Sequence, residues 1–233
     1  GKNKSDLSLA GLLENLVDID GLARIRLSSI EGTEISDRLL DLLAAEEKLC
    51  RHLHLPLQSG SDQILTAMNR PYSRAEFKGM VNRIRERIPD IAITSDVIVG
   101  FPGETEADFE ATYQLVEELE FSDVHVFKYS PREGTPAADY SDQVHSRVKK
   151  ERSKQLRELV EKLACRYKKQ FVGRKLSVLI EDNKDRETGY LTGLTDNYLR
   201  VAVPEAEQRV GELVAVKLEL EAGKLIGKPE NTI

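Results

Sequence analysis

The sequence predicts an α/β fold followed by a small all-β domain. Up to residue 143, four β-branched, apolar segments alternate with amphipathic helical segments, which is typical of right-handed βαβ units and a parallel sheet. After Gly173 the periodicity changes to short strands separated by polar turns. The length of 233 residues leaves room for one medium domain and one small one.

The composition is that of a soluble protein, with 40% hydrophobic and 32% charged residues. No apolar run approaches the length of a membrane span, and no leader of charged, apolar and small residues opens the sequence. We therefore expect a cytoplasmic protein without a membrane partner.

The helices of the first part are predicted from capping residues that precede apolar periodic runs. Ser5 and Asp6 open a helix with Leu9, Leu12, Leu13 and Leu16 on one face. Further helix starts are predicted at Ser36, Ser61, Ser73 and Thr105. Glu76 and Asp108 complete capping boxes with Ser73 and Thr105.

Four strands are expected at residues 23–30, 52–58, 93–99 and 123–129. Each ends in polar residues, which are Ser28 and Glu31, Gln58 and Ser59, Asp96 and Gly100, and Tyr129 and Ser130. Ligands of parallel α/β folds bind at the carboxyl edge of the sheet. The four strand ends therefore predict a shared polar pocket.

Asp96 is the one charge inside the apolar run 93–99, which ends in Gly-Phe-Pro-Gly at residues 100–103. A buried carboxylate must be paired or functional. The turn lets the backbone approach whatever lies above the strand end. A structural alternative stays open, in which Asp96 hydrogen-bonds to neighbouring backbone groups.

His52 and His54 point to the same side of their strand because strand side chains alternate. The remaining histidines, His125 and His145, offer no obvious completing set, so no metal is expected here. Packing or a hydrogen bond to a bound ligand is the favoured role. Cys50 and Cys165 lie in apolar contexts far apart and are expected to be buried rather than paired.

The net charge of −6 is unevenly distributed. Residues 144–175 hold twelve Lys or Arg against three Glu, on a long helix predicted at 146–171. This basic segment predicts an anionic partner, with a solvated helix face as the alternative.

The C-terminal strands, at 176–180, 188–194, 199–203 and 213–218, suit a compact barrel that closes its own edges. Barrels of this kind often bind oligonucleotides, but residues 176–233 carry seven basic and eleven acidic residues, so bulk charge cannot drive binding here. Tyr190, Asn197, Tyr198 and Arg200 could stack on or hydrogen-bond to bases, or could equally be packing and turn residues.

Four motifs together resemble the methylthiotransferases of the radical S-adenosylmethionine (SAM) superfamily. They are His-Leu-Pro-Leu-Gln-Ser-Gly-Ser at 54–61, Met-Asn-Arg-Pro-Tyr at 68–72, Thr-Ser-Asp-Val-Ile-Val-Gly-Phe-Pro-Gly-Glu-Thr at 94–105 and Phe-Lys-Tyr-Ser-Pro-Arg-Glu-Gly-Thr-Pro-Ala at 127–137. The terminal barrel resembles the TRAM domain, a small RNA-binding β-barrel. The stretches 52–54 and 124–127 look most like the enzymes that modify threonylcarbamoyladenosine in tRNA.

The resemblance implies a partial radical-SAM (βα) barrel lacking its first strands at 1–143, a joining basic amphipathic helix at 144–173 and a TRAM-like barrel at 174–233. It implies transfer of a methylthio group to C2 of a modified adenosine next to the anticodon. The implied cofactors are S-adenosylmethionine and [4Fe-4S] clusters, and the implied partners are tRNA and an electron donor protein.

The resemblance also implies roles for individual residues. Near the cofactor or the target base it places Glu31, Gln58, Ser59, Asp96, Gly100 and Phe127. As substrate-binding residues it indicates Arg70 and Arg132, which could hold carboxylate or phosphate in two hydrogen bonds. Tyr198 and Arg200 of the barrel are further candidate substrate-binding residues. Asp96 is the one candidate catalytic residue.

The sequence departs from the family in its cysteines. The family holds its radical cluster with Cys-x-x-x-Cys-x-x-Cys, and neither Cys50 nor Cys165 lies in such a motif. We expect the first strands and the cluster cysteines to precede Gly1 and the chain to be inactive alone.

Other hypotheses stay open. One is an RNA-binding module with an α/β scaffold, and another is a methylthiotransferase acting on a different modified adenosine or on a ribosomal protein. A phosphate-binding turn at 100–105 is a third, although this turn lacks the Gly-Lys-Ser/Thr ending of a P-loop.

Overall fold

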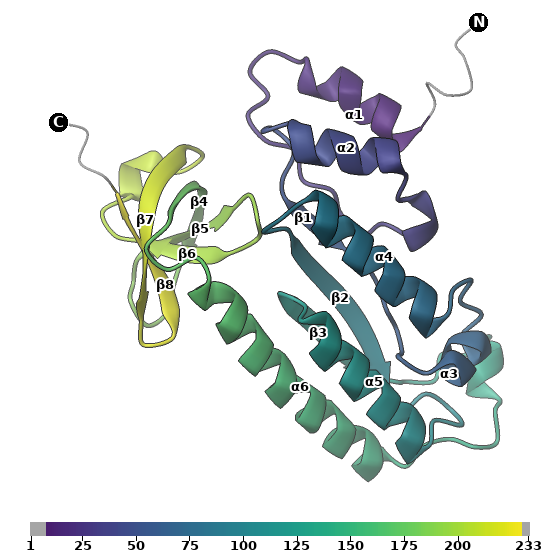
Figure 1. The fold of residues 1–233 in the computed structure, drawn as a ribbon. Coiled ribbons are helices and arrows are strands. Elements are labelled where there is room, and N and C mark those ends of the chain that lie inside the picture. The colour runs from purple at the N-terminus through teal and green to yellow at the C-terminus, as the bar shows by residue number, and fades with distance from the viewer. Residues whose placement is uncertain (1–7, 230–233) are drawn as a thin grey trace, which may run out of the picture.

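A computed structural model describes residues 8–229 as an α/β part and a small β-barrel, joined by one long helix (Figure 1). The helices of the α/β part are α1 (Leu9–Val17), α2 (Asp37–Ala45), α3 (Asp62–Ala67), α4 (Arg74–Arg87) and α5 (Glu106–Leu119), with short 3-10 turns η2 (Gly32–Glu34) and η3 (Pro136–Ala138). Its strands are β1 (His52–His54), β2 (Ala92–Val99) and β3 (Asp123–Lys128). The joining helix is α6 (Ser146–Lys169).

The three strands form a parallel sheet in the order β1-β2-β3. The prediction of a continuous strand at 23–30 is wrong, because this segment meets its neighbour only at the isolated bridges Ile25–Leu49 and Ser29–His54. The side chains of Arg24 and Arg26 in this segment instead reach the C-terminal barrel.

The predicted capping residues are confirmed. Ser36 accepts a hydrogen bond from the Leu39 amide, and both capping boxes, at Ser73 and at Thr105, are formed. The predicted start at Ser5 and Asp6 lies outside the described residues, and Ser8 caps α1.

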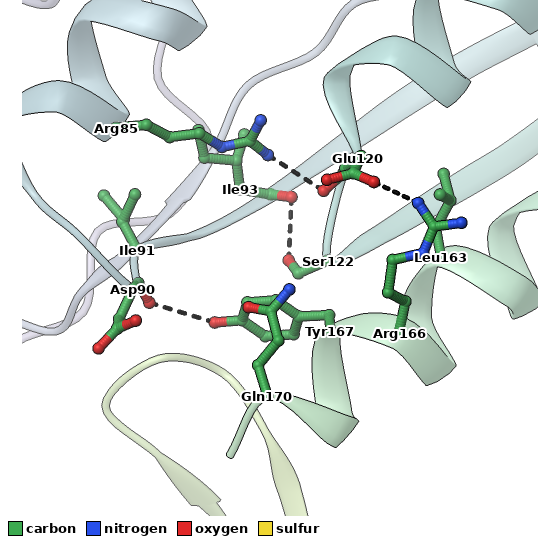
Figure 2. A pocket seen from close by; sticks show the side chains of 10 residues that line it. All are labelled: Arg85, Asp90, Ile91, Ile93, Glu120, Ser122, Leu163, Arg166, Tyr167 and Gln170. Atoms are coloured by element: carbon green, nitrogen blue, oxygen red, sulfur yellow. Dashed lines mark hydrogen bonds and ion pairs between the residues drawn. The ribbon is translucent and has the colours of Figure 1, made fainter.

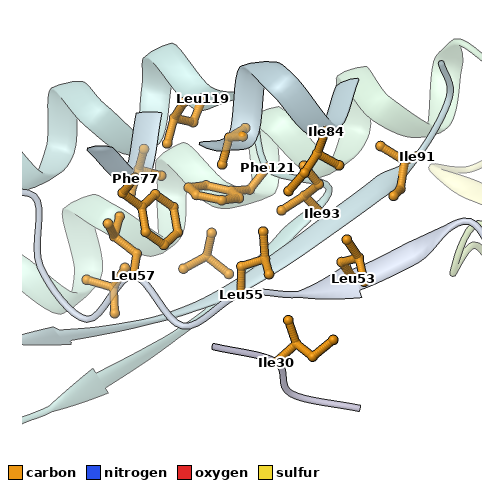
Figure 3. Packing of buried hydrophobic residues seen from close by; sticks show 14 of the residues in the cluster. Ile30, Leu53, Leu55, Leu57, Phe77, Ile84, Ile91, Ile93, Leu119 and Phe121 are labelled. Carbon is orange, nitrogen blue, oxygen red and sulfur yellow. The ribbon is translucent and has the colours of Figure 1, made fainter. Parts of the chain in front are cut away.

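The core fills the space between the sheet and the helices α4 and α5 (Figure 3). Leu53, Leu55 and Ile93 meet Phe77 and Phe121 there, and all are at most 3% exposed. Because side chains alternate along a strand, the opposite face of the same strands carries His52, His54, Thr94, Asp96, His125 and Phe127. The sheet thus has one apolar face and one polar face.

The C-terminal domain is a closed barrel in the order β4-β5-β6-β8-β7. Its strands are β4 (Lys175–Lys184), β5 (Leu191–Thr195), β6 (Arg200–Val203), β7 (Leu213–Glu221) and β8 (Lys224–Pro229), with a 3-10 turn η4 (Glu207–Arg209). Its core is separate from that of the sheet and includes Phe171, Val201 and Val216.

The sequence patterns missed β8, which closes the barrel by pairing with β7 and with β6. Its apolar run is short and contains Gly227, whose missing side chain is required by the packing. A Cβ atom there would lie 2.7 Å from Val216 Cγ2 and 2.8 Å from Val201 Cγ1. Only the closed barrel shows why glycine occupies this strand.

Within residues 8–229, none of the helices combines the length and the apolar character needed to cross a bilayer.

Candidate active site

The polar face of the sheet lines a cavity of about 430 Å³. The strands contribute His52 and His54 from β1, Thr94 and Asp96 from β2, and His125 from β3. The remaining lining residues are Arg26, Leu27, Ser28, Ser29 and, from the barrel, Tyr198. Of the eight strand-end residues predicted to share a pocket, this cavity includes Ser28 and Asp96, and its other lining residues come from the sheet face, the segment 26–29 and, in Tyr198, the second domain.

A hydrogen-bonded chain runs through this cavity. Thr94 Oγ1 lies 2.9 Å from both His52 Nε2 and His54 Nδ1, and His54 Nε2 lies 3.2 Å from Asp96 Oδ2. If His54 donates from Nε2 to Asp96, its Nδ1 accepts from the Thr94 hydroxyl, and Thr94 in turn accepts from His52 Nε2. One threonine hydroxyl thus couples the tautomers of two histidines.

His52 is the buried end of this chain. Burial, with smaller contributions from the charges of Arg26 and His54, lowers the pKa of His52 to about 3. His52 is therefore neutral near pH 7. Among the described residues, no hydrogen-bond partner reaches its Nδ1.

Asp96 is half-open to the cavity, with 26% of its side chain exposed. The Asp96 carboxylate contacts the imidazole of His54. The structural alternative, in which Asp96 hydrogen-bonds to neighbouring backbone groups, would have required amide donors near this carboxylate. A carboxylate directed into a cavity is available to bind a ligand.

The turn after β2 is shaped by a buried ion pair that the sequence patterns missed. Gly100 has φ +73°, and its amide donates to Glu104 Oε1 at 2.8 Å. Glu104 also accepts from Arg152 of α6 at 2.6 Å, and the two side chains are 1% and 7% exposed. Burial raises the pKa of Glu104. In the sequence, the position of Glu104 directly after Gly-Phe-Pro-Gly was a sign that its carboxylate has a role in the turn. Its partner, Arg152, could not be found in the same way because it lies 48 residues further along the chain.

The turn after β1 is held against α5. Ser59 is fully buried, with its hydroxyl 3.3 Å from Thr112 Oγ1, and the Gly60 amide donates to the same oxygen at 2.9 Å. Ser61 donates to Asp108 at 2.5 Å. The Gln-Ser-Gly-Ser motif therefore positions the strand end, and the structure places Ser59 away from the cavity. Gln58 lies at φ +66° and bridges to Val97.

The other predicted residues are spread around this centre. Phe127, 52% exposed, follows His125 on the same face of β3. Glu31 caps η2 and is exposed, and exposed Arg132 lies in the loop after β3. Arg70 is partly buried, and among the described residues its Nε has no hydrogen-bond partner. The structure thus brings Asp96 and Tyr198 into one cavity. The lining of this cavity does not include the other predicted residues, which are Glu31, Gln58, Ser59, Arg70, Gly100, Phe127, Arg132 and Arg200.

The barrel docks against the cavity through its β5–β6 turn. Arg26 donates to the carbonyl oxygens of Thr195 at 2.7 Å and Asp196 at 3.1 Å, and Arg24 donates to that of Leu194 at 3.1 Å. The Tyr198 ring stacks on His52, with centroids 4.0 Å apart and planes at 4°. A residue of the second domain therefore forms a wall of the site on the first.

A second cavity, of about 390 Å³, adjoins the first. It lies between β3, α6 and the barrel, and it shares His125 and Tyr198 with the first cavity. Lys168 and Arg200 also line it. Arg200 is held by Glu181 at 2.8 Å. Because they share these two wall residues, the two cavities together extend from the sheet face to the barrel and are called the junction groove below.

A third cavity, of about 210 Å³, lies between the sheet and the C-terminal end of α6 (Figure 2). Its polar groups are largely satisfied internally: Arg85 donates to the Glu120 carbonyl, Arg166 pairs with the Glu120 side chain, and the Tyr167 hydroxyl reaches the Asp90 carbonyl. We interpret it as part of the structural junction.

The basic residues of α6 are partly used inside the molecule. Arg152 pairs with Glu104, Arg157 donates to the Val126 carbonyl at 2.8 Å, and Lys149 donates to the Tyr129 carbonyl at 3.1 Å. The charge of this helix therefore has a structural role in holding the edge strand β3, in addition to any role toward an anionic partner.

The two cysteines do not fit an iron–sulfur cluster. Cys50 is buried, and burial raises the pKa of its thiol, whereas Cys165 lies on α6. Cluster ligation needs several thiolates at one place. Neither cysteine belongs to the group of possible metal ligands among the described residues.

Comparison with known proteins agrees with this architecture. Residues 5–116 match the radical SAM superfamily, and residues 169–220 match the TRAM domain. The chain is 42% identical to threonylcarbamoyladenosine tRNA methylthiotransferase MtaB of Bacillus subtilis, over 96% of this chain and 50% of that protein. It is also 42% identical to tRNA-2-methylthio-N(6)-dimethylallyladenosine synthase of Geobacillus kaustophilus, over 94% of this chain and 41% of that protein. The chain spans about half the length of these curated relatives.

Among solved structures, coproporphyrinogen III oxidase (HemN) of Escherichia coli, a radical SAM enzyme, shares the fold. Its TM-score is 0.53 at 17% identity, covering 89% of this chain and 54% of that one. At this identity the likeness supports the fold alone. The resemblance to methylthiotransferases and the predicted order of an α/β part and a barrel are confirmed. The chain therefore carries a radical SAM domain at residues 5–116 and a TRAM domain at residues 169–220.

Proposed function

We propose that this chain is the C-terminal portion of a tRNA methylthiotransferase that adds a methylthio group to C2 of a modified adenosine next to the anticodon. The observation that supports this most directly is the junction groove, because it connects the polar sheet face around Asp96 to the TRAM domain through His125 and Tyr198. A nucleotide held at the barrel would thereby have a path to the face that bears Asp96.

The names of the relatives divide between two substrates, threonylcarbamoyladenosine and dimethylallyladenosine, at the same identity. A threonylcarbamoyl group carries a carboxylate and a hydroxyl, whereas a dimethylallyl group is a hydrocarbon. The cavity is lined by three histidines, Arg26 and Asp96. These side chains, among them His52, whose Nδ1 has no hydrogen-bond partner among the described residues, could hydrogen-bond to a carboxylate or a hydroxyl, so the lining favours the threonylcarbamoyl substrate.

Residue roles follow from the positions around the groove. We propose Asp96 as the residue that binds the cofactor or the base and acts in catalysis, with Phe127 on the same sheet face beside the adenine. Gly100 and Gln58 would shape the strand-end edge for S-adenosylmethionine, and Tyr198 and Arg200 would contact RNA on the barrel side.

Glu31, Arg70 and Arg132 remain candidates on the periphery, for cofactor, carboxylate or phosphate. Ser59 would act by holding its turn. The division into 1–143, 144–173 and 174–233 is part of the same proposal.

S-adenosylmethionine and a [4Fe-4S] cluster would supply the radical that activates C2, with electrons from a donor protein. Because Cys50 and Cys165 do not fit the cluster, its thiolates would come from other residues of the whole protein. We therefore propose that the chain alone is inactive. Reconstitution of the chain with iron and sulfide, followed by optical spectroscopy, tests this, and a stable stoichiometric cluster would contradict it.

The function is tested in a whole protein that contains this chain and the cluster ligands. Asp96→Asn should abolish or strongly reduce methylthioadenosine in tRNA, measured by mass spectrometry of nucleosides, while tRNA binding persists. Glu118→Gln, on the outer face of α5, is the matched control. Unchanged modification in the Asp96 variant would return this residue to a structural role.

A second candidate function is RNA binding with the α/β part as scaffold, which is favoured by the separate core of the barrel. Tight, salt-dependent tRNA binding without any methylthiolation by the whole protein would support this candidate.

A further inference from the structure

Three side chains on the polar sheet face converge in a way that the sequence did not indicate. The ligand atoms of His54, Asp96 and His125 all lie within 4.8 Å of one another. They come from three different strands, and the parallel register places His125 directly opposite Asp96. His54 stands opposite Thr94, two residues before Asp96. The backbone of the sheet therefore fixes the arrangement.

We propose that His54, Asp96 and His125 form a binding site for a divalent first-row transition ion of the Zn²⁺ class. Two imidazoles and one carboxylate are a ligand set typical of such ions. The donor atoms of neighbouring ligands around Zn²⁺ lie about 3.4 Å apart when the bonds are about 2.1 Å long. His54 Nε2 and Asp96 Oδ2, at 3.2 Å, already have this separation.

The third ligand needs a small adjustment. The His54 and His125 ring centroids are 6.0 Å apart, and His125 is exposed on the edge strand β3. For the ion to bind, a change of the His125 rotamer would have to bring its nitrogen to about 3.4 Å from the other two ligand atoms. The ion would bind between three side chains whose backbone positions are already set by the sheet.

Thr94 supplies the supporting contact that metal-bound histidines usually have. With an ion on His54 Nε2, the proton of this imidazole lies on Nδ1 and is donated to Thr94 Oγ1, 2.9 Å away. The Thr94 hydroxyl then donates to His52 Nε2, also at 2.9 Å. Binding an ion thus replaces the hydrogen bond between His54 and Asp96 by two metal bonds and reverses the two hydrogen bonds from His54 through Thr94 to His52. The proton of His52 then lies on Nδ1, which has no hydrogen-bond partner among the described residues.

The charges around the cluster are compatible with a cation. Asp96 is the one carboxylate among the lining residues, and the lining arginine, Arg26, is directed to the carbonyl oxygens of the barrel. Three protein ligands leave coordination positions open toward the cavity, as in sites that bind a further oxygen or nitrogen ligand.

The test is direct metal binding to the purified chain after treatment with a chelator. Zn²⁺ is titrated by calorimetry, Co²⁺ by its visible absorption, and bound metal is counted by elemental analysis. We expect one ion per chain. Asp96→Asn and His125→Gln should each weaken binding by at least about tenfold, and Thr94→Val by about 10–100-fold, the range known for supporting partners.

Two controls separate this cluster from adventitious binding. His145→Gln removes the exposed histidine that caps α6, and Cys165→Ser removes the more accessible thiol. Both should keep the wild-type affinity and stoichiometry. Circular dichroism establishes that each variant is folded. Wild-type affinity in the Asp96 and His125 variants, or less than one bound ion in the unaltered chain, would overturn the proposal.

Discussion

Removal of Arg152 should destabilise the protein more than removal of any exposed basic residue of α6. Arg152 donates to both the carbonyl and the carboxylate of Glu104 and also pairs with Glu106 at 3.1 Å. In Arg152→Met the Glu104 carboxylate stays buried, with the Gly100 amide as its remaining hydrogen-bond donor among the described residues. Breaking a buried pair by removing one partner costs about 3–5 kcal/mol.

The loss should depend on pH in a defined direction. Burial already raises the pKa of Glu104, and loss of the guanidinium raises it further. The folded variant then binds a proton more tightly than the unfolded chain, so its stability falls as pH rises from the ordinary carboxyl range through the raised value. The loss relative to wild type should therefore be larger at pH 8 than at pH 5.

The measurement is urea unfolding followed by circular dichroism at both pH values. A loss of 3 kcal/mol lowers the midpoint by at least about 1 M. Lys154→Met is the matched control, because this lysine lies on the same helix in a solvent-exposed pair with Glu158. It should change stability by less than about 0.5 kcal/mol.

The double variant Glu104→Gln with Arg152→Met removes both charges and should recover part of the loss. A loss below about 1 kcal/mol in Arg152→Met, or an equal loss at pH 5 and pH 8, would refute the reasoning.

Three further predictions concern the site and its supports. The pKa of His52 is lowered to about 3 in the folded protein, so as pH falls below about 6.5 the unfolded chain binds a proton that the folded chain does not. The free energy of unfolding should therefore decrease as pH falls from about 6.5 towards 3. In His52→Gln, denaturation curves should show a smaller decrease over the same pH range. Tyr198→Ala removes the ring that stacks on His52. The free energy of unfolding should fall by about 0.5–1.5 kcal/mol more than the loss of buried apolar area accounts for. An unchanged free energy of unfolding would argue against the docking of the barrel on the sheet. Gly60→Ala should lower the free energy of unfolding by about 1–3 kcal/mol, measured by thermal unfolding, because the new Cβ atom would lie 2.6 Å from Thr112 Cα. Gly79→Ala on α4 is the control. Its Cβ atom would enter open space, so this change should leave the stability unchanged or raise it.

Local patterns predicted the features that depend on neighbours in sequence. The caps at Ser36, Ser73 and Thr105 were predictable because a cap bonds to amides three residues away. The polar face of the sheet was predictable from the alternation of His52 and His54, and the barrel was predictable from its short strands. Gly-Phe-Pro-Gly marked the turn that follows Asp96.

The segment 23–30 shows where local patterns were not enough. Its apolar and β-branched residues read as a strand, but a strand needs a continuous ladder, and here β1 is only three residues long. The bridges at Ile25 and Ser29 are what remains, and Arg24 and Arg26, on either side of Ile25, bind the barrel.

By itself, the sequence determined the order of helices and strands, their caps, the polar strand ends and the likeness to methylthiotransferases. Tertiary structure alone decided the partners: Asp96 with His54 and His125, Glu104 with Arg152, and Tyr198 of the barrel with His52. The physical reason is that these partners are separated by tens of residues and meet only through strand register and domain docking. The secondary-structure propensity of a residue depends on its own side chain and on its neighbours in sequence, whereas the charged or aromatic side chain that it contacts is determined by the tertiary fold.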